Sequence, residues 1–342
     1  MYRFCLLVIF LLISNPAHAN TLGESQPRSG RTFPGPRPSL ADLWQNADHV
    51  IFGEVERIKP LTSKLGKQVY TYGAQNVIYI KHQFKGPREL QMQSIVVETR
   101  VTSEAPCSFE MGTQVIAFIR KDDGKYIAGS SHSRIVLEDG EFKHYKQAFE
   151  RLPEILSEKE DEVRRSKLVA WYVDLAVEPV TRYQGALGLS WARARSKNKS
   201  KNVLSDQQAR RLIKKVVSES PPIGDTASVL NYLKDYPSRD LDLLMLESLR
   251  RSHEPGWERL TRTAFDTLPA RLGVKLSPET EQRRKEWGEL LSLVYYNFDK
   301  KKPSEEQQTL YKERYHIVWG SLTYDVYIQC RAALENDALD SK

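Results

Sequence analysis

The chain has 342 residues, of which 40% are hydrophobic and 28% charged, and its formal net charge is +7 at pH 7. These values are ordinary for a globular protein, so they exclude a disordered chain, a collagen-like chain and a multi-span membrane protein. Three cysteines are too few for a disulfide-stapled scaffold, and at about 150 residues per domain the length predicts about two domains.

Residues 1–19 have the features of a secretory signal peptide. Arg3 gives a positive start, residues 4–13 are apolar, and Ala17-His18-Ala19 is a small-x-small cleavage motif. Such a short apolar helix spans about 15 Å, half of a hydrocarbon core of about 30 Å, which disfavours an uncleaved anchor. We therefore expect cleavage after Ala19, a periplasmic or secreted protein, and no transmembrane segment in the mature chain. Cleavage removes one basic and no acidic residue, so the mature chain stays mildly basic.

The composition of residues 20–38 predicts a flexible leader, and the pattern of residues 39–145 predicts a β-rich domain. The leader is rich in Pro, Gly, Arg and Ser, and Ser39 after it can cap a short helix. Beyond that helix, apolar and β-branched runs predict five to seven strands, at residues 49–58, 68–84, 90–99, 115–119, 126–127 and 135–137 and around Phe142. Gly73 predicts a bulge or bend, and residues 122–125 (DDGK) predict a hairpin turn. This pattern is typical of a small closed or half-open barrel.

Residues 146–342 change to the helical period. Ser205 and Ser304 each begin an S-x-x-Q capping box, and Ser277-Pro278 marks another helix start. Further helices are predicted at residues 146–156, 158–176, 179–195, 225–235, 239–252 and 256–271. Gly185 and Gly188 lie within this pattern and predict a close helix–helix contact. The fold class is therefore α+β multidomain: an OB-like β-barrel followed by an all-α domain, either an irregular bundle or a HEAT-like array.

Four segments of the β-rich domain resemble the netrin-like, or tissue-inhibitor-of-metalloproteinase-like, OB-fold superfamily. Residues 47–55 (ADHVIFGEV) match its opening strand, and residues 77–86 match a strand that ends in a Lys-Gly turn. Residues 96–99 match the following strand, and residues 107–118 match a C-x-F-x-x-G segment that leads into a hydrophobic strand. The resemblance covers about a third of the chain, implies an OB-like barrel, and suggests protease inhibition.

The cysteines depart from that family. The inhibitors place an N-terminal cysteine on the protease zinc, whereas the expected mature chain begins at Asn20 and has no cysteine nearby. The family's downstream cysteine is also absent over residues 130–134, so Cys107 lacks its usual partner, which favours a disulfide with Cys330. Two separate buried thiols remain the alternative, because sequence spacing gives no geometry.

A basic run at residues 193–215 is the main charge feature. It has nine basic residues and one acidic residue, Asp206. An anionic contact would use these side chains: Arg193, Arg195, Lys197, Lys199, Lys201, Arg210, Arg211, Lys214 and Lys215. The suggested partners are a protein, an anionic surface or a glycan. Nucleic acid is disfavoured, because the chain has an export signal and the run lacks interleaved aromatic residues. A solvated loop and helix face is the alternative.

Catalytic and cofactor motifs are missing from the sequence. The six histidines after the signal show no metal-ligand spacing, and there is no nucleotide-binding glycine motif, so no cofactor is expected. We therefore expect a non-enzymatic binding protein of the cell envelope that uses the barrel rim and the basic run. An atypical protease inhibitor is one alternative, and a hydrolase with an inter-domain site that uses His132 or Cys107 is another. The oligomeric state is not indicated.

Overall fold

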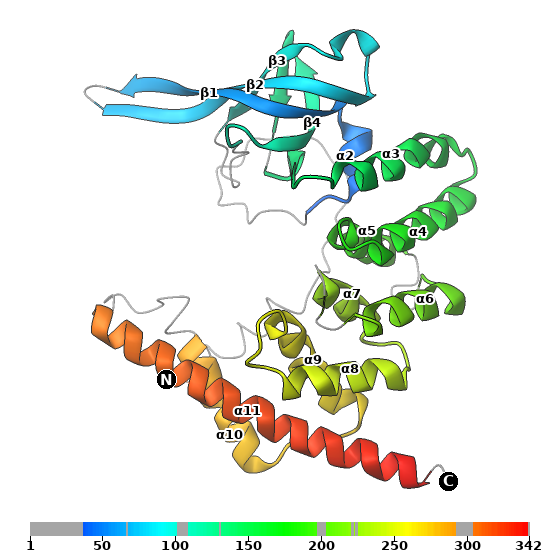
Figure 1. Ribbon diagram of the computed structural model, residues 1–342, viewed down its shortest axis with the longest axis vertical. Coiled ribbons are helices and arrows are strands. Elements are labelled where there is room, and N and C mark those ends of the chain that lie inside the picture. Colours follow the sequence, from blue (N-terminus) through cyan, green and yellow to red (C-terminus); the bar gives the residue numbers. More distant parts are fainter. Residues whose placement is uncertain are drawn as a thin grey trace, which may run out of the picture. The chain divides into compact units, whose positions relative to one another are not determined.

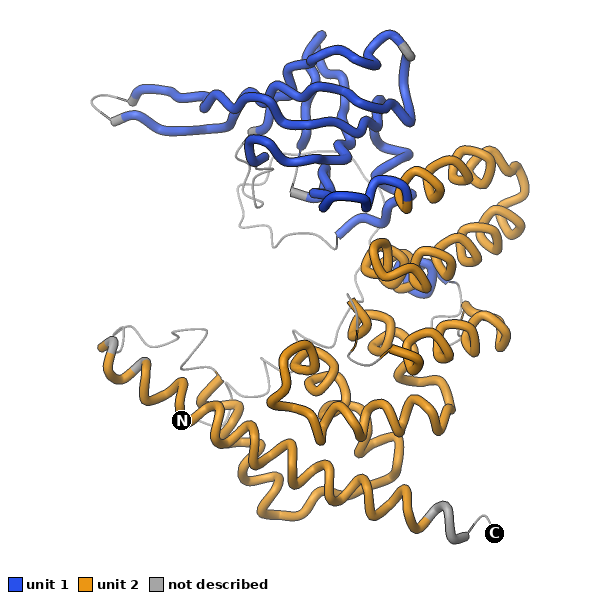
Figure 2. The backbone as a smooth tube through the Cα atoms, in the orientation of Figure 1, with its two compact units in different colours: residues 1–143, 191–201 blue, residues 144–190, 202–342 orange. Residues whose placement is uncertain are grey.

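The computed structural model describes residues 37–65, 68–100, 109–129, 131–196, 203–219, 222, 225–291 and 304–340. These residues form a closed β-barrel in the first half and ten α-helices, nine of which follow the barrel, so the α+β layout is confirmed (Figure 1). Two compact units are present (Figure 2). The barrel unit comprises residues 1–143 and 191–201, and the helical unit comprises residues 144–190 and 202–342.

Five strands close the barrel, and a sixth extends it. The strands are β1 (His49–Leu65), β2 (Gln68–Lys85), β3 (Ser94–Arg100), β4 (Gln114–Asp122), β5 (Lys125–Ala128) and β6 (Arg134–Leu137). Their order is β1-β2-β3-β5-β4, and β4 returns to pair with β1, while β6 adds to the other edge of β4. The β3–β5 pair is parallel, and the other pairs are antiparallel. The short helix α2 (Leu40–Asn46) precedes β1 and has a capping box from Ser39 to Asp42.

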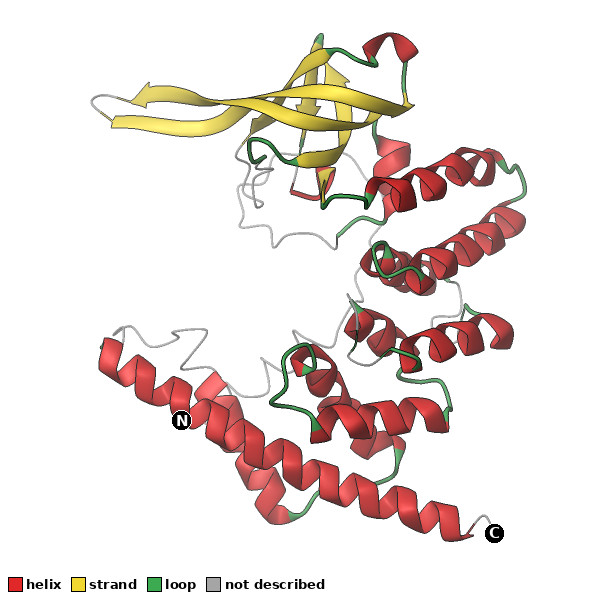
Figure 3. Cartoon of the chain, viewed as in Figure 1, coloured by secondary structure: helices red, strands yellow, loops and turns green. Residues whose placement is uncertain are grey.

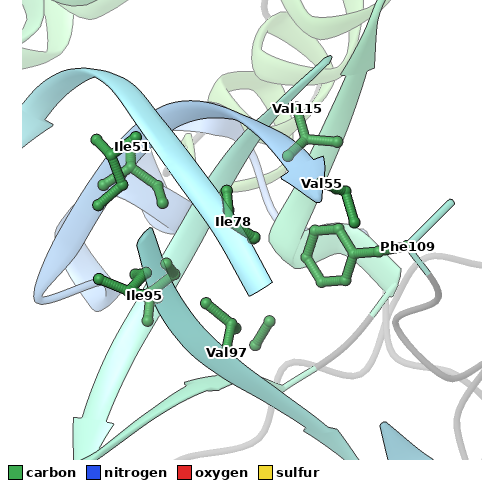
Figure 4. Close-up of a cluster of buried hydrophobic side chains, with 11 residues drawn as sticks. Ile51, Val55, Ile78, Ile95, Val97, Phe109 and Val115 are labelled. Carbon is green, nitrogen blue, oxygen red and sulfur yellow. The ribbon is translucent and has the colours of Figure 1, made fainter. Parts of the chain in front are cut away.

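The barrel interior is a single apolar cluster from all five closing strands (Figure 4). Alternate residues of each strand point to the same face of the sheet, so one set of side chains meets inside the closed barrel. The members are Ile51, Val55, Ile78, Ile80, Ile95, Val97, Phe109, Val115, Ala117, Ile119 and Ala128. The alternation that predicts the strands therefore also identifies the core.

Gly53 of β1 lies close to the backbone of the paired strand β2. A Cβ atom there would overlap the carbonyl oxygen of Tyr79 and come within 2.8 Å of the Ile78 side chain. The carbonyl belongs to the β2 backbone, so it cannot move without breaking the pairing of β1 with β2.

We expect Gly53→Ala to lower the free energy of unfolding by about 2 kcal/mol, because overpacking forces a backbone shift. Gly129→Ala is the matched control, since a Cβ there meets no atom within 4 Å, and it should change stability by less than about 0.5 kcal/mol. Urea denaturation of both variants checks this. Equal midpoints for the two would contradict the close approach.

Two strand assignments from the sequence differ from the structure. β1 continues to Leu65 instead of ending at residue 58, because Pro60 lies in a stretch that pairs with β2 alone, where a missing N–H is tolerated. Phe142 is wrong as a strand residue: it begins helix α3 and stacks on Phe52 at a centroid distance of 4.0 Å. The hairpin turn at residues 122–125 is confirmed, with positive φ at Asp123 and Gly124.

The remaining nine helices belong mainly to the helical unit (Figure 3). They are α3 (Phe142–Ser157), α4 (Asp161–Val177), α5 (Arg182–Ala194), α6 (Asp206–Val217), α7 (Thr226–Leu233), α8 (Arg239–Arg250), α9 (Glu258–Arg271), α10 (Pro278–Leu291) and α11 (Glu305–Asp340). The capping boxes at Ser205 and Ser304 are confirmed. Gly185 and Gly188 of α5 pack against Tyr172 and Ala176 of α4, which confirms the predicted close contact.

A buried ion pair joins four elements of the helical unit. The Arg182 side chain at the start of α5 has no exposed surface, and Glu219 after α6 is 5% exposed. The two form parallel hydrogen bonds of 2.6 and 2.7 Å, and Arg182 also donates to Thr226 of α7 and the Ala176 carbonyl of α4. Burial opposes ionisation of Glu219, but the hydrogen bonds and charges of Arg182 and Lys215 hold its pKa below the ordinary value.

Candidate interaction surfaces

The part of the basic run that lies in the barrel unit is used within that unit. The Arg195 guanidinium forms an ion pair with Asp42 of α2 at 2.9 Å and lies 4.7 Å from the Trp191 ring centroid. The Trp191 indole N–H donates to the Arg37 carbonyl. Arg193 is partly buried, and Lys197, Lys199 and Lys201 lie outside the described residues. This part of the run therefore stabilises the barrel unit.

Two of the four basic residues that the run places on α6 form ion pairs within the helical unit. Arg211 binds Asp174 of α4 at 2.6 Å, and Lys215 lies 3.4 Å from Glu219. Arg210 and Lys214 are exposed on one face, and no ion pair is described for either. They line a hollow of ≈ 540 Å³ together with Ile213, Val217, Ser218, Pro237, Ser238 and Asp240. Of the α6 residues in the predicted patch, Arg210 and Lys214 are thus the two best placed to meet an anionic partner.

A second basic surface, which the sequence alone does not predict, is a long two-stranded arm. We call residues 57–65 of β1 and 68–75 of β2 the β1–β2 arm. β1 and β2 continue together past the other strands of the barrel (Figures 1 and 3). Among the described residues, β2 pairs with β3 only from Gly73 onward, and β1 pairs with β4 only up to Glu54. The outer part of the arm therefore pairs only with itself in the described chain.

The arm is basic and contains no acidic residue. Four basic residues, Arg57, Lys59, Lys64 and Lys67, lie between residues 57 and 75, and Asp and Glu are absent there. Arg57, Lys59 and Lys64 are exposed, and Lys67 lies outside the described residues. Glu98, which pairs with Gln75 across the sheet, is buried and forms an ion pair with Lys125 at 3.4 Å. The arm therefore presents an excess of positive charge.

Apolar and aromatic side chains are exposed beside these charges. Val69 is 60% exposed, and Tyr70 and Tyr72 are each 46% exposed. Tyr70 pairs with Ser63 and Val69 pairs with Lys64, so neighbouring residues of β2 point to opposite faces of the ribbon. The predicted bulge near Gly73 is confirmed by a register shift between Leu61 and Thr62. Both faces of the arm carry exposed apolar surface.

The structure describes only some of the candidate catalytic and disulfide residues. His132 lies in the short 3-10 helix η2 (Ser131–Ser133), and Cys107 lies outside the described residues, so the hydrolase alternative stays a prediction. Cys330 of α11 has a free thiol with no exposed surface, and burial raises the pKa of Cys330 to about 12. Its pairing with Cys107 also stays a prediction.

The described residues were also searched for a metal-ligand cluster and for a membrane-spanning helix, and the chain was compared with known proteins. Within the described part of the chain, no three His, Cys, Asp or Glu side chains are grouped so that they could hold a metal ion. None of the described helices combines the length and the apolar character needed to cross a bilayer. Comparisons with protein-family models, with curated proteins and with solved structures gave no match to this chain.

Proposed function

We propose that this protein is an exported, non-enzymatic binding protein of the cell envelope that contacts an anionic partner through the β1–β2 arm. The observation that carries the proposal is the composition of the arm, in which three exposed basic residues and no acidic residue lie next to three exposed apolar side chains. Aromatic residues and arginine are enriched where proteins bind partners, and a field of one sign steers an oppositely charged partner.

The arm is favoured over the basic run because a larger share of its described charges remains available, since only Arg210 and Lys214 of the run are both exposed and without a described ion pair. In the run, Arg195, Arg211 and Lys215 bind carboxylates of their own unit. For Lys59 and Lys64 of the arm, no ion pair is described, and both side chains are exposed. A charge already paired within the protein attracts an external anion less strongly than a solvated one.

The test compares two charge reversals of equal size. K59E/K64E on the arm and R210E/K214E on α6 each lower the net charge by the same amount. We expect K59E/K64E to lose about 2 kcal/mol or more of binding free energy to dextran sulfate, at about 1 kcal/mol per basic residue near an anionic surface. The α6 variant should lose clearly less.

Surface plasmon resonance at two salt concentrations measures the effect, because exposed charges are screened by salt. Immobilised protein should also retain a salt-sensitive component of envelope extract, and K59E/K64E should not. Undiminished binding by K59E/K64E, together with loss in R210E/K214E, would assign the function to α6 instead.

We further propose kinship of the barrel with the netrin-like OB-fold superfamily. The closed order β1-β2-β3-β5-β4 with a parallel β3–β5 pair supports it, as does the glycine at the close approach of β1 and β2. An atypical protease inhibitor is therefore the second candidate function. Assays against metalloproteases and serine proteases test it, and inhibition of none would dispose of it.

For the helical unit we propose a HEAT-like array rather than an irregular bundle. The supporting observation is the pattern of helix contacts, which links near neighbours along the chain. α6 contacts α4, α7 and α8, α9 contacts α7 and α8, and α11 contacts α8, α9 and α10.

A further inference from the structure

We infer that the anionic partner of the β1–β2 arm is a lipid bilayer, and that the outer part of the arm inserts into its headgroup region. The inference rests on the proposed function, because it specifies the partner of the same arm. It follows from how charge and apolar surface are distributed over the two faces of the ribbon.

Both faces of the arm combine a basic with an apolar side chain. Tyr70 lies opposite Ser63 on one face, which also carries Lys59, since alternate residues of a strand share a face. Val69 lies opposite Lys64 on the other face. A flat protein surface would cover one face of the ribbon and leave the apolar side chain of the other face in water. The headgroup region surrounds an inserted ribbon and therefore meets both faces at once.

The side-chain types fit an interface between water and hydrocarbon. Tyrosine has an apolar ring and a polar hydroxyl, and it is enriched at membrane interfaces. Lysine can bury its methylene stem and keep its ammonium group among lipid phosphates. Val69, the most exposed of the three at 60%, has no polar atom in its side chain and gains most from leaving water.

The length of the outer part of the arm also fits the depth of the headgroup region. A strand rises about 3.3 Å per residue, so residues 68–72 of β2 span roughly 15 Å. Interfacial segments sink about 5–10 Å into the boundary between headgroups and acyl chains. Only the outer part of the arm needs to enter, and the barrel core stays outside.

The experiment measures cosedimentation of the full chain with vesicles of phosphatidylcholine, with and without phosphatidylglycerol. We expect binding that depends on the anionic lipid. K59E/K64E should weaken partitioning at least about 30-fold, at about fivefold per basic residue near the surface. R210E/K214E should stay within a few-fold of the unmodified protein.

A second variant separates insertion from charge attraction. V69S/Y70S/Y72S keeps every charge and removes the apolar side chains. It should bind vesicles about tenfold more weakly and yet bind dextran sulfate as the unmodified protein does, since a soluble polyanion offers nothing to insert into. Circular dichroism and thermal unfolding of each variant serve as the control that the barrel remains folded.

The outcomes distinguish this inference from the proposed function. Binding to dextran sulfate or to an acidic protein without binding to anionic vesicles would overturn the lipid inference and leave the proposed function standing. Vesicle binding that V69S/Y70S/Y72S does not weaken would overturn insertion. Absence of binding to both vesicles and polyanion would overturn both proposals.

Discussion

Replacing Arg182 with methionine is expected to destabilise the helical unit by about 3–5 kcal/mol, the usual cost of breaking a buried ion pair. The variant leaves Glu219, which is 5% exposed, without the guanidinium that binds both of its carboxylate oxygens. It also removes hydrogen bonds that connect α4, α5 and α7. Chemical denaturation followed by the helical circular dichroism signal measures the loss.

Two further variants test whether the loss comes from the unpaired charge of Glu219. R182M/E219M removes both charges and should recover much of the stability, because apolar replacement of a buried pair is often tolerated. Arg211→Ala removes an exposed ion pair with Asp174 and should cost less than about 1 kcal/mol. A loss below 1 kcal/mol in Arg182→Met would contradict the role of the pair.

The Arg182–Glu219 pair makes the free energy of unfolding fall at acid pH. The pKa of Glu219 is lower in the folded state than its ordinary value, so the folded state favours the ionised form. Its contribution is therefore complete above the ordinary glutamate pKa of about 4.3 and is lost as the pH falls through the lower, folded-state pKa. Glu219→Gln should flatten this acid limb of the stability curve.

The second large effect is expected for Gly185→Val. A Cβ at Gly185 would lie 2.6 Å from the Tyr172 carbonyl oxygen and closer still to the Ala176 backbone nitrogen. Both atoms belong to the α4 backbone, so the two helices must separate, and we expect a loss of about 3 kcal/mol.

Gly320→Ala on α11 is the control for that variant, since a Cβ at Gly320 meets no atom within 4 Å. Alanine in an open helical position should stabilise the protein by about 0.5–1 kcal/mol. Thermal unfolding should therefore shift in opposite directions for the two glycines. A shift in the same direction would contradict the α4–α5 packing.

Features that depend on neighbours in sequence could be predicted. The capping boxes at Ser205 and Ser304 involve residues three apart, and the turn at Asp123-Gly124 is a two-residue hairpin signal. The strand positions follow from local alternation, which also gives the barrel core.

Features that depend on distant partners could not be predicted. Arg182 and Glu219 are 37 positions apart, and a charged residue at a helix start is usually exposed, so nothing local indicates a buried pair. The basic run has the composition of a binding patch, yet Asp42 and Asp174, far away in sequence, bind two of its arginines.

The β1–β2 arm could not be predicted from the sequence either, because it also depends on a partner that is distant in sequence. Lys59 and Pro60 resemble the end of a strand, and only the pairing with β2 shows that β1 continues to Leu65. The available signal was the absence of acidic residues between residues 57 and 75, which is visible in the sequence but has no meaning until the two strands are placed side by side.

Hydrogen–deuterium exchange of the full chain with and without dextran sulfate tests most directly whether the arm holds the anionic partner. We expect slower exchange in peptides that cover residues 57–75 and no change in peptides that cover α6, Asp206–Val217. Slower exchange at α6 with an unchanged arm would contradict this expectation.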